Sequence, residues 1–221
     1  MSCDRPRASR ASRVERPLAR DTVQGRTETV SDAAGKALAE HVALASRLDE
    51  LLPTVEQVAR LLIETYSAGG RVYAFGNGGS AADAQHLAAE LVGRYVRERE
   101  PLAATALSVD PSVVTSIAND YAFDDVFARQ VRALVQRGDV VVGFTTSGRS
   151  PNVVRGLEAA RAAEARTVLL SAGDGGDTAP HADHALLVAS STTARIQEMH
   201  ILLVHLVIEQ VDDWAAGAGR A

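Results

Sequence analysis

Cysteine, lysine and aromatic residues are all scarce in this chain of 221 residues. The single cysteine, Cys3, has no partner for an internal disulfide, which excludes a disulfide framework and is consistent with a reducing compartment. Aromatic residues make up 4% of the chain and hydrophobic residues 46%, so the core must be built mainly from Ala, Val, Leu and Ile. The length suits one compact domain and is too short for two of ordinary size.

Long apolar runs are also absent. None approaches the roughly 20 residues that span a bilayer, so we expect no membrane contact. Residues 1–20 are polar throughout and lack the apolar segment of a secretory signal. The sequence therefore predicts a cytoplasmic protein.

Charge is distributed unevenly along the chain. Residues 1–26 contain seven arginines and three acidic residues, which leaves 16 basic and 25 acidic side chains, a net charge of −9, in the remainder. An acidic body repels phosphates, so we do not expect a globular nucleic-acid binder, although a basic arm could touch an anionic surface. We interpret residues 1–28 as a disordered polar extension, residues 29–215 as the domain and residues 216–221 as a C-terminal tail.

Apolar periodicity predicts two helices followed by alternating strands and helices. The first helix spans residues 30–52, and the second begins after Pro53 and continues through Tyr66. Five short apolar runs are predicted as strands: residues 71–76, 104–109, 139–144, 166–171 and 184–189. This alternation predicts an α/β fold, a parallel five-stranded sheet flanked by helices, of the flavodoxin-like or Rossmann-like three-layer type.

The last predicted helix, residues 194–214, carries apolar residues nearly all round. Such a helix must be buried on several sides, and a small domain offers few places to bury it. We therefore expect packing against another subunit, and so a homo-oligomer.

Two loops follow predicted strands and precede predicted helices, where parallel sheets bind ligands. GNGGS, residues 76–80, can present several backbone N–H groups at a helix N-terminus, which favours an anion. TTSGRS, residues 145–150, adds four hydroxyls, and Pro151 is placed to open the next helix. Either loop alone could be only a tight turn with an N-cap, but the two together indicate a phosphate site.

A nucleotide cofactor is not expected. The G-x-G-x-x-G spacing is absent because residue 81 is Ala, and no Walker lysine follows because Lys36 is the only lysine in the chain.

His86 and Glu90 lie four residues apart, so on a helix they project from one face. They could hold a divalent ion, act as an acid/base pair or form an ordinary surface contact. The C-terminal helix adds further polar groups in an apolar setting, and they need partners. Among them His200 could support the site or simply be packed, and Gln197 and His205 are roughly 12 Å apart along a helix axis.

Four segments, in this order and spacing, resemble the phosphoheptose isomerases of the sugar-isomerase (SIS) domain superfamily. They are residues 76–95, 116–131, 145–154 and 194–209, and the resemblance covers about residues 30–213. It implies conversion of sedoheptulose 7-phosphate to D-glycero-D-manno-heptose 7-phosphate. It also implies a homotetramer with active sites near subunit interfaces and one Zn²⁺ ion in each site.

The resemblance also implies roles for individual residues. Glu90 and His205 match the acid/base pair of the family. The implied metal ligands are His86, Glu90, Gln197 and His205. The implied substrate-binding residues are Asn77, Gly78, Gly79, Ser80, Glu90, Asn119, Asp120, Thr145, Thr146, Ser147, Ser150 and Gln197.

One position departs from the pattern of some isomerases in the family. Ala194 stands three residues before Gln197, where those enzymes carry Asp. A related non-catalytic member that associates with the bacterial replication initiator shares the segment Ala-Arg-Ile-Gln-Glu, but it resembles the isomerases less at the later histidine. Retention of His205 favours the enzyme. The alternatives are another sugar-phosphate isomerase, and a non-catalytic sugar-phosphate sensor or replication-initiator partner.

Overall fold

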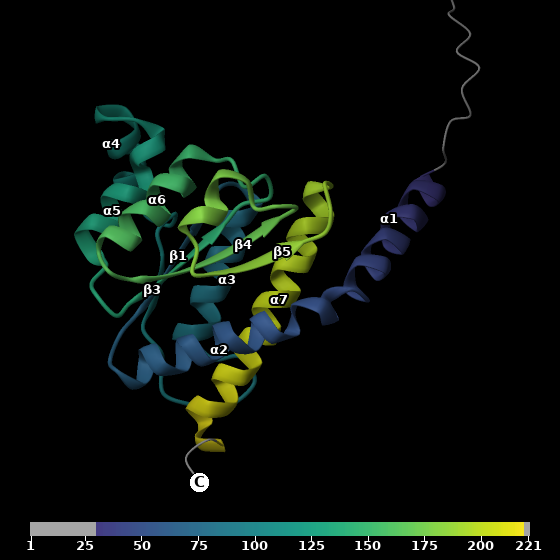
Figure 1. Cartoon of the computed structure of the whole chain (residues 1–221), viewed down its shortest axis with the longest axis horizontal. Helices are drawn as coiled ribbons and strands as arrows, with labels where there is room; N and C mark the ends of the chain where they lie inside the picture. Colours follow the sequence, from purple (N-terminus) through teal and green to yellow (C-terminus); the bar gives the residue numbers. More distant parts are fainter. Residues whose placement is uncertain (1–29, 219–221) are drawn as a thin grey trace, which may run out of the picture.

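A parallel five-stranded sheet forms the centre of the protein in a computed structural model that describes residues 30–218 (Figure 1). Its order is β2-β1-β3-β4-β5, and every neighbouring pair is parallel. The strands are β1 Val72–Gly76, β2 Ala104–Ala106, β3 Val140–Phe144, β4 Arg166–Ala172 and β5 His184–Val188. The predicted α/β class and five-stranded sheet are confirmed; only β2 is markedly shorter than its predicted range of 104–109.

Helices cover both faces of the sheet because the strands are apolar on both sides. All five residues of β1 and of β3 are buried, as expected for strands between two helical layers. One apolar core lies under α2 Leu52–Ser67, α3 Gly79–Val92 and α7 Thr193–Asp213. The opposite core lies under α4 Pro111–Asp120, α5 Val126–Leu134 and α6 Pro151–Ala162. These two cores give the predicted three layers.

The first helix, α1 Val30–Ala45, extends away from the body (Figure 1). It ends earlier than the predicted range of 30–52, because residues Leu48–Leu51 form a separate 3-10 turn before α2. None of its residues is buried, and Leu38 and Val42 are 64% and 59% exposed. Leu44 and Ala45 at its C-terminal end pack against the core, whereas Leu38 and Val42 are not covered by the described part of this chain.

Polar contacts attach α1 to α7. His41 Nδ1 lies 2.7 Å from Glu198 Oε2, and Arg195 pairs with the same carboxylate while donating to the carbonyl oxygen of Ala37. None of the described helices is long and apolar enough to cross a membrane. The predicted extension, residues 1–28, lies outside the described residues.

His200 lies in the core of α7 and contacts the sheet. Its side chain is fully buried, its Nε2 is 3.1 Å from the carbonyl oxygen of Ser171, and its Nδ1 has no hydrogen-bond partner among residues 30–218. Burial lowers the pKa of His200 from 6.5 to about 4, and the hydrogen bond to Ser171 offsets part of this effect. Of the two roles left open by the sequence, the structure places this imidazole in the packed core.

Because folding lowers the pKa of His200, the unfolded chain binds its proton more tightly than the folded protein does. Stability is therefore complete above pH 6.5 and falls as pH drops toward 4, by up to about 1.4 kcal/mol per pH unit from this group. His200→Gln, which keeps a donor for Ser171, should flatten this part of the curve. Urea unfolding between pH 4 and pH 8 measures it, and identical slopes for the two proteins would contradict the assignment.

Candidate active site

The candidate site begins at the carboxyl ends of β1 and β3, where the strand order reverses. The loops after these strands run into the N-termini of α3 and α6, the usual position for ligands in this architecture. Gly78 has φ +57°, a backbone conformation that glycine adopts without strain. Gly79 allows close packing, because a Cβ atom there would lie 2.3 Å from Nε2 of Gln197 on α7.

A cavity of about 160 Å³ lies between these loops and the start of α7. It is lined by Asn77, Ser80, Phe144, Thr145, Thr146, Ser147, Ser150, Thr193 and Gln197. Reciprocal amide hydrogen bonds of 2.8 and 2.9 Å between Asn77 and the buried Asn152 hold the β1 loop against α6. The lining offers hydroxyls and amides with no charged side chain, and helix N-termini add positive potential, so an anion such as phosphate fits it.

Most of the loop residues predicted to bind the phosphate and the sugar therefore line one cavity. Asn119 and Asp120 are placed elsewhere, exposed at the C-terminal end of α4, where Asn119 Nδ2 donates to Asp120 Oδ1 over 2.8 Å. Neither lines the cavity, and their role in substrate binding stays a prediction.

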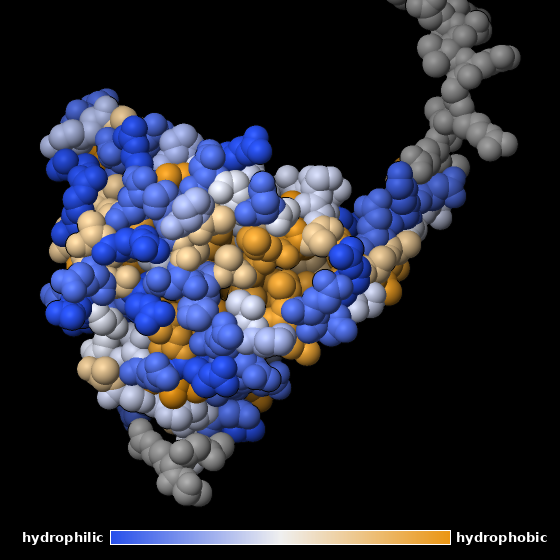
Figure 2. Space-filling model, in the orientation of Figure 1, coloured by the Kyte–Doolittle hydropathy of each residue, from blue (hydrophilic) through white to orange (hydrophobic). Residues whose placement is uncertain are grey.

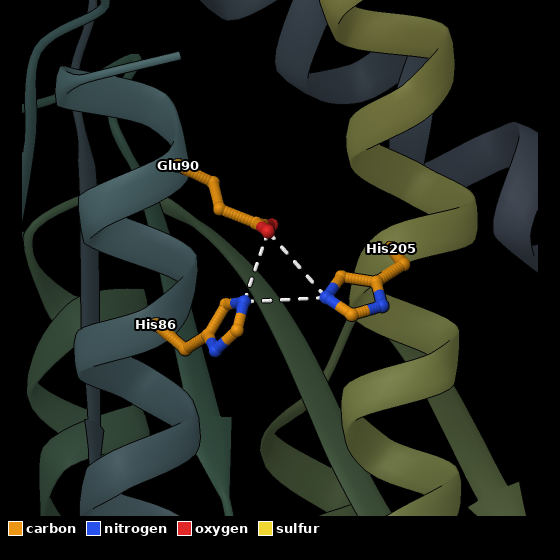
Figure 3. A group of neighbouring side chains, drawn as sticks. All are labelled: His86, Glu90 and His205. Carbon is orange, nitrogen blue, oxygen red and sulfur yellow. Dashed lines mark hydrogen bonds and ion pairs between the residues drawn. The ribbon is translucent and has the colours of Figure 1, made fainter. Parts of the chain in front are cut away.

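Three of the four predicted metal ligands converge between α3 and α7 (Figure 3). His86 Nε2 lies 2.9 Å from Glu90 Oε1, and His205 Nε2 lies 3.2 Å from His86 Nε2 and 3.4 Å from Glu90 Oε1. The i, i+4 spacing on α3 places His86 and Glu90 on one face, and His205 reaches them from α7 (Figure 3).

This trio, His86, Glu90 and His205, has the chemistry of a divalent metal site. Imidazole nitrogen and carboxylate oxygen are both zinc ligands, and the three ligand atoms lie within 4.8 Å of one another. The Glu90 side chain is 14% exposed, and its Oε2 is buried with no hydrogen-bond partner among residues 30–218. A buried carboxylate oxygen without a partner is costly, and a bound cation would relieve that cost.

Gln197 lies against Gly79 at the cavity rather than beside His205. Gly79 contacts Gln197, and further along both helices His86 contacts His205. Because the residue numbers increase together, α3 and α7 lie side by side and run in the same direction. The cavity and the trio therefore lie one after the other along the same pair of helices. Ligation by Gln197 stays a prediction.

Sequence reasoning missed two residues beside the trio. Asp83 lies one turn before His86, and its Oδ2 is buried with no hydrogen-bond partner among residues 30–218. Burial raises the pKa of Asp83 to about 6, although His86 lowers it in part. Its spacing from Gly79 and His86 was a usable signal, because all three share one helix face. Tyr95, whose ring centroid is 5.7 Å from that of His205, lies in a loop and gave no such signal.

Comparison with known proteins identifies the family. The SIS domain family model matches residues 38–172. Phosphoheptose isomerase from Helicobacter pylori (strain ATCC 700392 / 26695) is 48% identical over 175 residues, 79% of this chain and 91% of that protein. The enzyme of the same name from Thiobacillus denitrificans is 48% identical over 172 residues, 76% of this chain and 87% of its own length.

Solved structures agree. Phosphoheptose isomerase GmhA from Neisseria gonorrhoeae matches with a TM-score of 0.80 and 41% identity, covering 84% of this chain and all of that one. A phosphoheptose isomerase from Francisella tularensis matches with a TM-score of 0.81 and 32% identity, covering 84% and 99% of the two chains. The chain belongs to the phosphoheptose isomerase family of SIS-domain proteins.

Proposed function

We propose that this protein converts sedoheptulose 7-phosphate to D-glycero-D-manno-heptose 7-phosphate, a ketose-to-aldose isomerisation. The observation that carries the proposal is the convergence of His86, Glu90 and His205 beside an uncharged, hydroxyl-lined cavity. Relatives at 48% identity that bear the name phosphoheptose isomerase support it.

The spacing of Gly79 and His86 along α3 suits a seven-carbon sugar phosphate. His86 lies seven positions after Gly79 on α3, about 10 Å of rise along the helix axis. An extended chain of seven carbons with bonds of about 1.5 Å spans on the order of 8 Å. With the phosphate held by the loop that contains Ser147, and the sugar by residues 77–80, C1 and C2 would reach Glu90 and His205.

The reaction moves a proton between C1 and C2 through a cis-enediol, so it needs a base, an acid and stabilisation of the developing oxyanion. Glu90 and His205 take the acid and base roles in this proposal, because they match the acid/base pair that the family resemblance implies. Their side chains lie together in the trio, with His205 Nε2 3.4 Å from Glu90 Oε1. Asn119 and Asp120 are assigned to substrate contact as well. No nucleotide cofactor takes part in this scheme.

His86, Glu90 and His205, with Gln197 as the fourth ligand, would hold one zinc ion in each site. The unpartnered Oε2 of Glu90 supports this assignment. When bound, the ion supplies Lewis-acid polarisation of the carbonyl and hydroxyl oxygens.

We also propose a homotetramer located in the cytoplasm. Leu38 and Val42 on α1 are exposed apolar residues, and Figure 2 shows hydrophobic residues gathered on the visible face of the body beside this helix. Such a surface is typical of a subunit interface. We further propose that residues 1–28 form an extension, residues 29–215 the domain and residues 216–221 a C-terminal tail.

A non-catalytic sugar-phosphate sensor is the second candidate. The observation that favours it is Ala194, which is exposed next to the cavity-lining Thr193 and offers no carboxylate there. Binding of the sugar phosphate by a zinc-loaded wild type with no turnover would select this function.

Glu90→Gln and His205→Ala should each lower kcat by at least about 100-fold, because each removes a proton-transfer group. The assay follows formation of the aldose from sedoheptulose 7-phosphate at saturating zinc. His181→Ala, which removes a histidine paired with Glu158 elsewhere in the fold, is the matched control and should keep wild-type activity. Wild-type rates in either site variant would remove that residue from the mechanism.

Ser147→Ala should raise KM about tenfold with little change in kcat, because it removes one hydrogen bond to a charged phosphate far from the reacting carbons. Ser67→Ala, which removes an exposed hydroxyl bonded within α2, serves as the control. Initial rates over a range of substrate concentrations measure both constants. An unchanged KM would show that the loop at 145–150 does not hold the phosphate.

A further inference from the structure

A buried ion pair joins the C-terminal ends of the two helices that carry the trio. Arg99 Nε lies 2.9 Å from Asp212 Oδ1, and the two side chains are 0% and 2% exposed. Arg99 follows α3 in the segment 93–103, and Asp212 is in the last turn of α7. No residue of this pair belongs to the cavity or the trio.

Arg99 also binds the backbone of the candidate acid/base residue. Its Nη2 donates to the carbonyl oxygen of Glu90 over 2.6 Å, and its Nη1 donates to that of Leu91 over 3.0 Å. The last carbonyls of a helix have no partners within the helix, so the guanidinium satisfies them here. The main chain of Glu90 is thereby linked through Arg99 to Asp212 on α7.

Asp212 holds the segment beside His205 as well. Its Oδ2 accepts hydrogen bonds from the backbone N–H groups of Val96 and Arg97, at 3.2 and 2.9 Å. These residues directly follow Tyr95, whose ring contacts the imidazole of His205. One carboxylate therefore fixes both Arg99 and the position of the ring that packs on His205.

We propose that Arg99 and Asp212 are positioning residues that set the spacing of α3 and α7 at the trio. The inference rests on the proposed function. The close contact of Gly79 with Gln197 fixes one end of this helix pair, and the ion pair fixes the other, with the trio between them. Misplacement of catalytic groups by about 1 Å is enough to slow a reaction by about 100-fold.

The presence of an ion pair at this buried position, rather than apolar side chains, supports a positioning role for Arg99 and Asp212. A buried pair often contributes no more stability than apolar residues of the same volume, because both charges lose their hydration. Apolar residues could not bond the carbonyl oxygen of Glu90 and the N–H groups of Val96 and Arg97 in fixed directions. Directional contact with the two helix ends is what Arg99 and Asp212 add.

Arg99→Lys is the principal test, because it keeps the charge beside Asp212 and loses the planar fork that reaches Glu90 and Leu91 together. We expect kcat to fall about 10- to 100-fold and zinc affinity about tenfold, with KM within about twofold of wild type because the cavity lies at the other end of the helices. Steady-state rates with sedoheptulose 7-phosphate and competition for zinc with a chromophoric chelator give the three values.

Two control variants separate positioning from general stability. Asp213→Asn removes the neighbouring carboxylate, which is 48% exposed and paired with Arg97, and should change none of the three values. Asp139→Asn removes a buried carboxylate that accepts backbone N–H groups of Arg71 and Gln136 at the opposite end of the sheet. It should lower the melting temperature without changing kcat or zinc affinity below that temperature.

The measurements distinguish a failure of the positioning role from a failure of the proposed function. A folded Arg99→Lys protein with a lower melting temperature but wild-type kcat and zinc affinity overturns the positioning role and leaves the proposed function intact. If Arg99→Lys does not fold, Asp212→Glu, which keeps the charge and lengthens the side chain, must show the same loss of kcat and zinc affinity, and wild-type values there overturn the role. A wild-type protein that neither binds zinc nor turns over substrate overturns the proposed function, and the positioning role with it.

Discussion

The parallel alignment of α3 and α7 is the constraint on which the candidate site depends. Each helix starts at the carboxyl edge of the sheet, so their first turns face the cavity and their later turns form the trio. The absence of a side chain at Gly79 lets the helices meet at one end, and Arg99 with Asp212 joins them at the other. The packed apolar core beneath them, which includes Leu87 and Leu203, keeps both helices on the same face of the sheet.

In the proposed site, neutral groups would bind the substrate and titratable groups would carry out the proton transfer. The cavity offers hydroxyls, amides and helix N-termini for the phosphate rather than a charged side chain. The titratable groups gather one helical turn or more away, where burial leaves the oxygens of Asp83 and Glu90 without partners. Burial raises the pKa of Asp83 to about 6. A buried carboxylate oxygen without a partner, such as Oε2 of Glu90, favours a bound cation.

Local sequence patterns were enough for the sheet, the two loops and the pairing of His86 with Glu90, because each depends on short-range periodicity or turn chemistry. The partnership of His205 with that pair came from the family resemblance, since 114 residues of chain lie between Glu90 and His205. The end of α1 at Ala45 was missed because the apolar periodicity continues through the 3-10 turn that follows. Arg99 and Asp212 were missed because each stands next to other charged residues in the sequence and is buried only by tertiary contact.

Metal-dependent turnover tests the central claim most directly. Wild-type protein is purified, stripped with a chelator, assayed with sedoheptulose 7-phosphate, and assayed again after zinc is restored. The account predicts isomerisation that disappears on stripping and returns with zinc, because the trio of His86, Glu90 and His205 would hold the ion beside the reacting carbons. Full activity in the stripped protein would contradict the metal site, and inactivity in the zinc-loaded protein would contradict the isomerase itself.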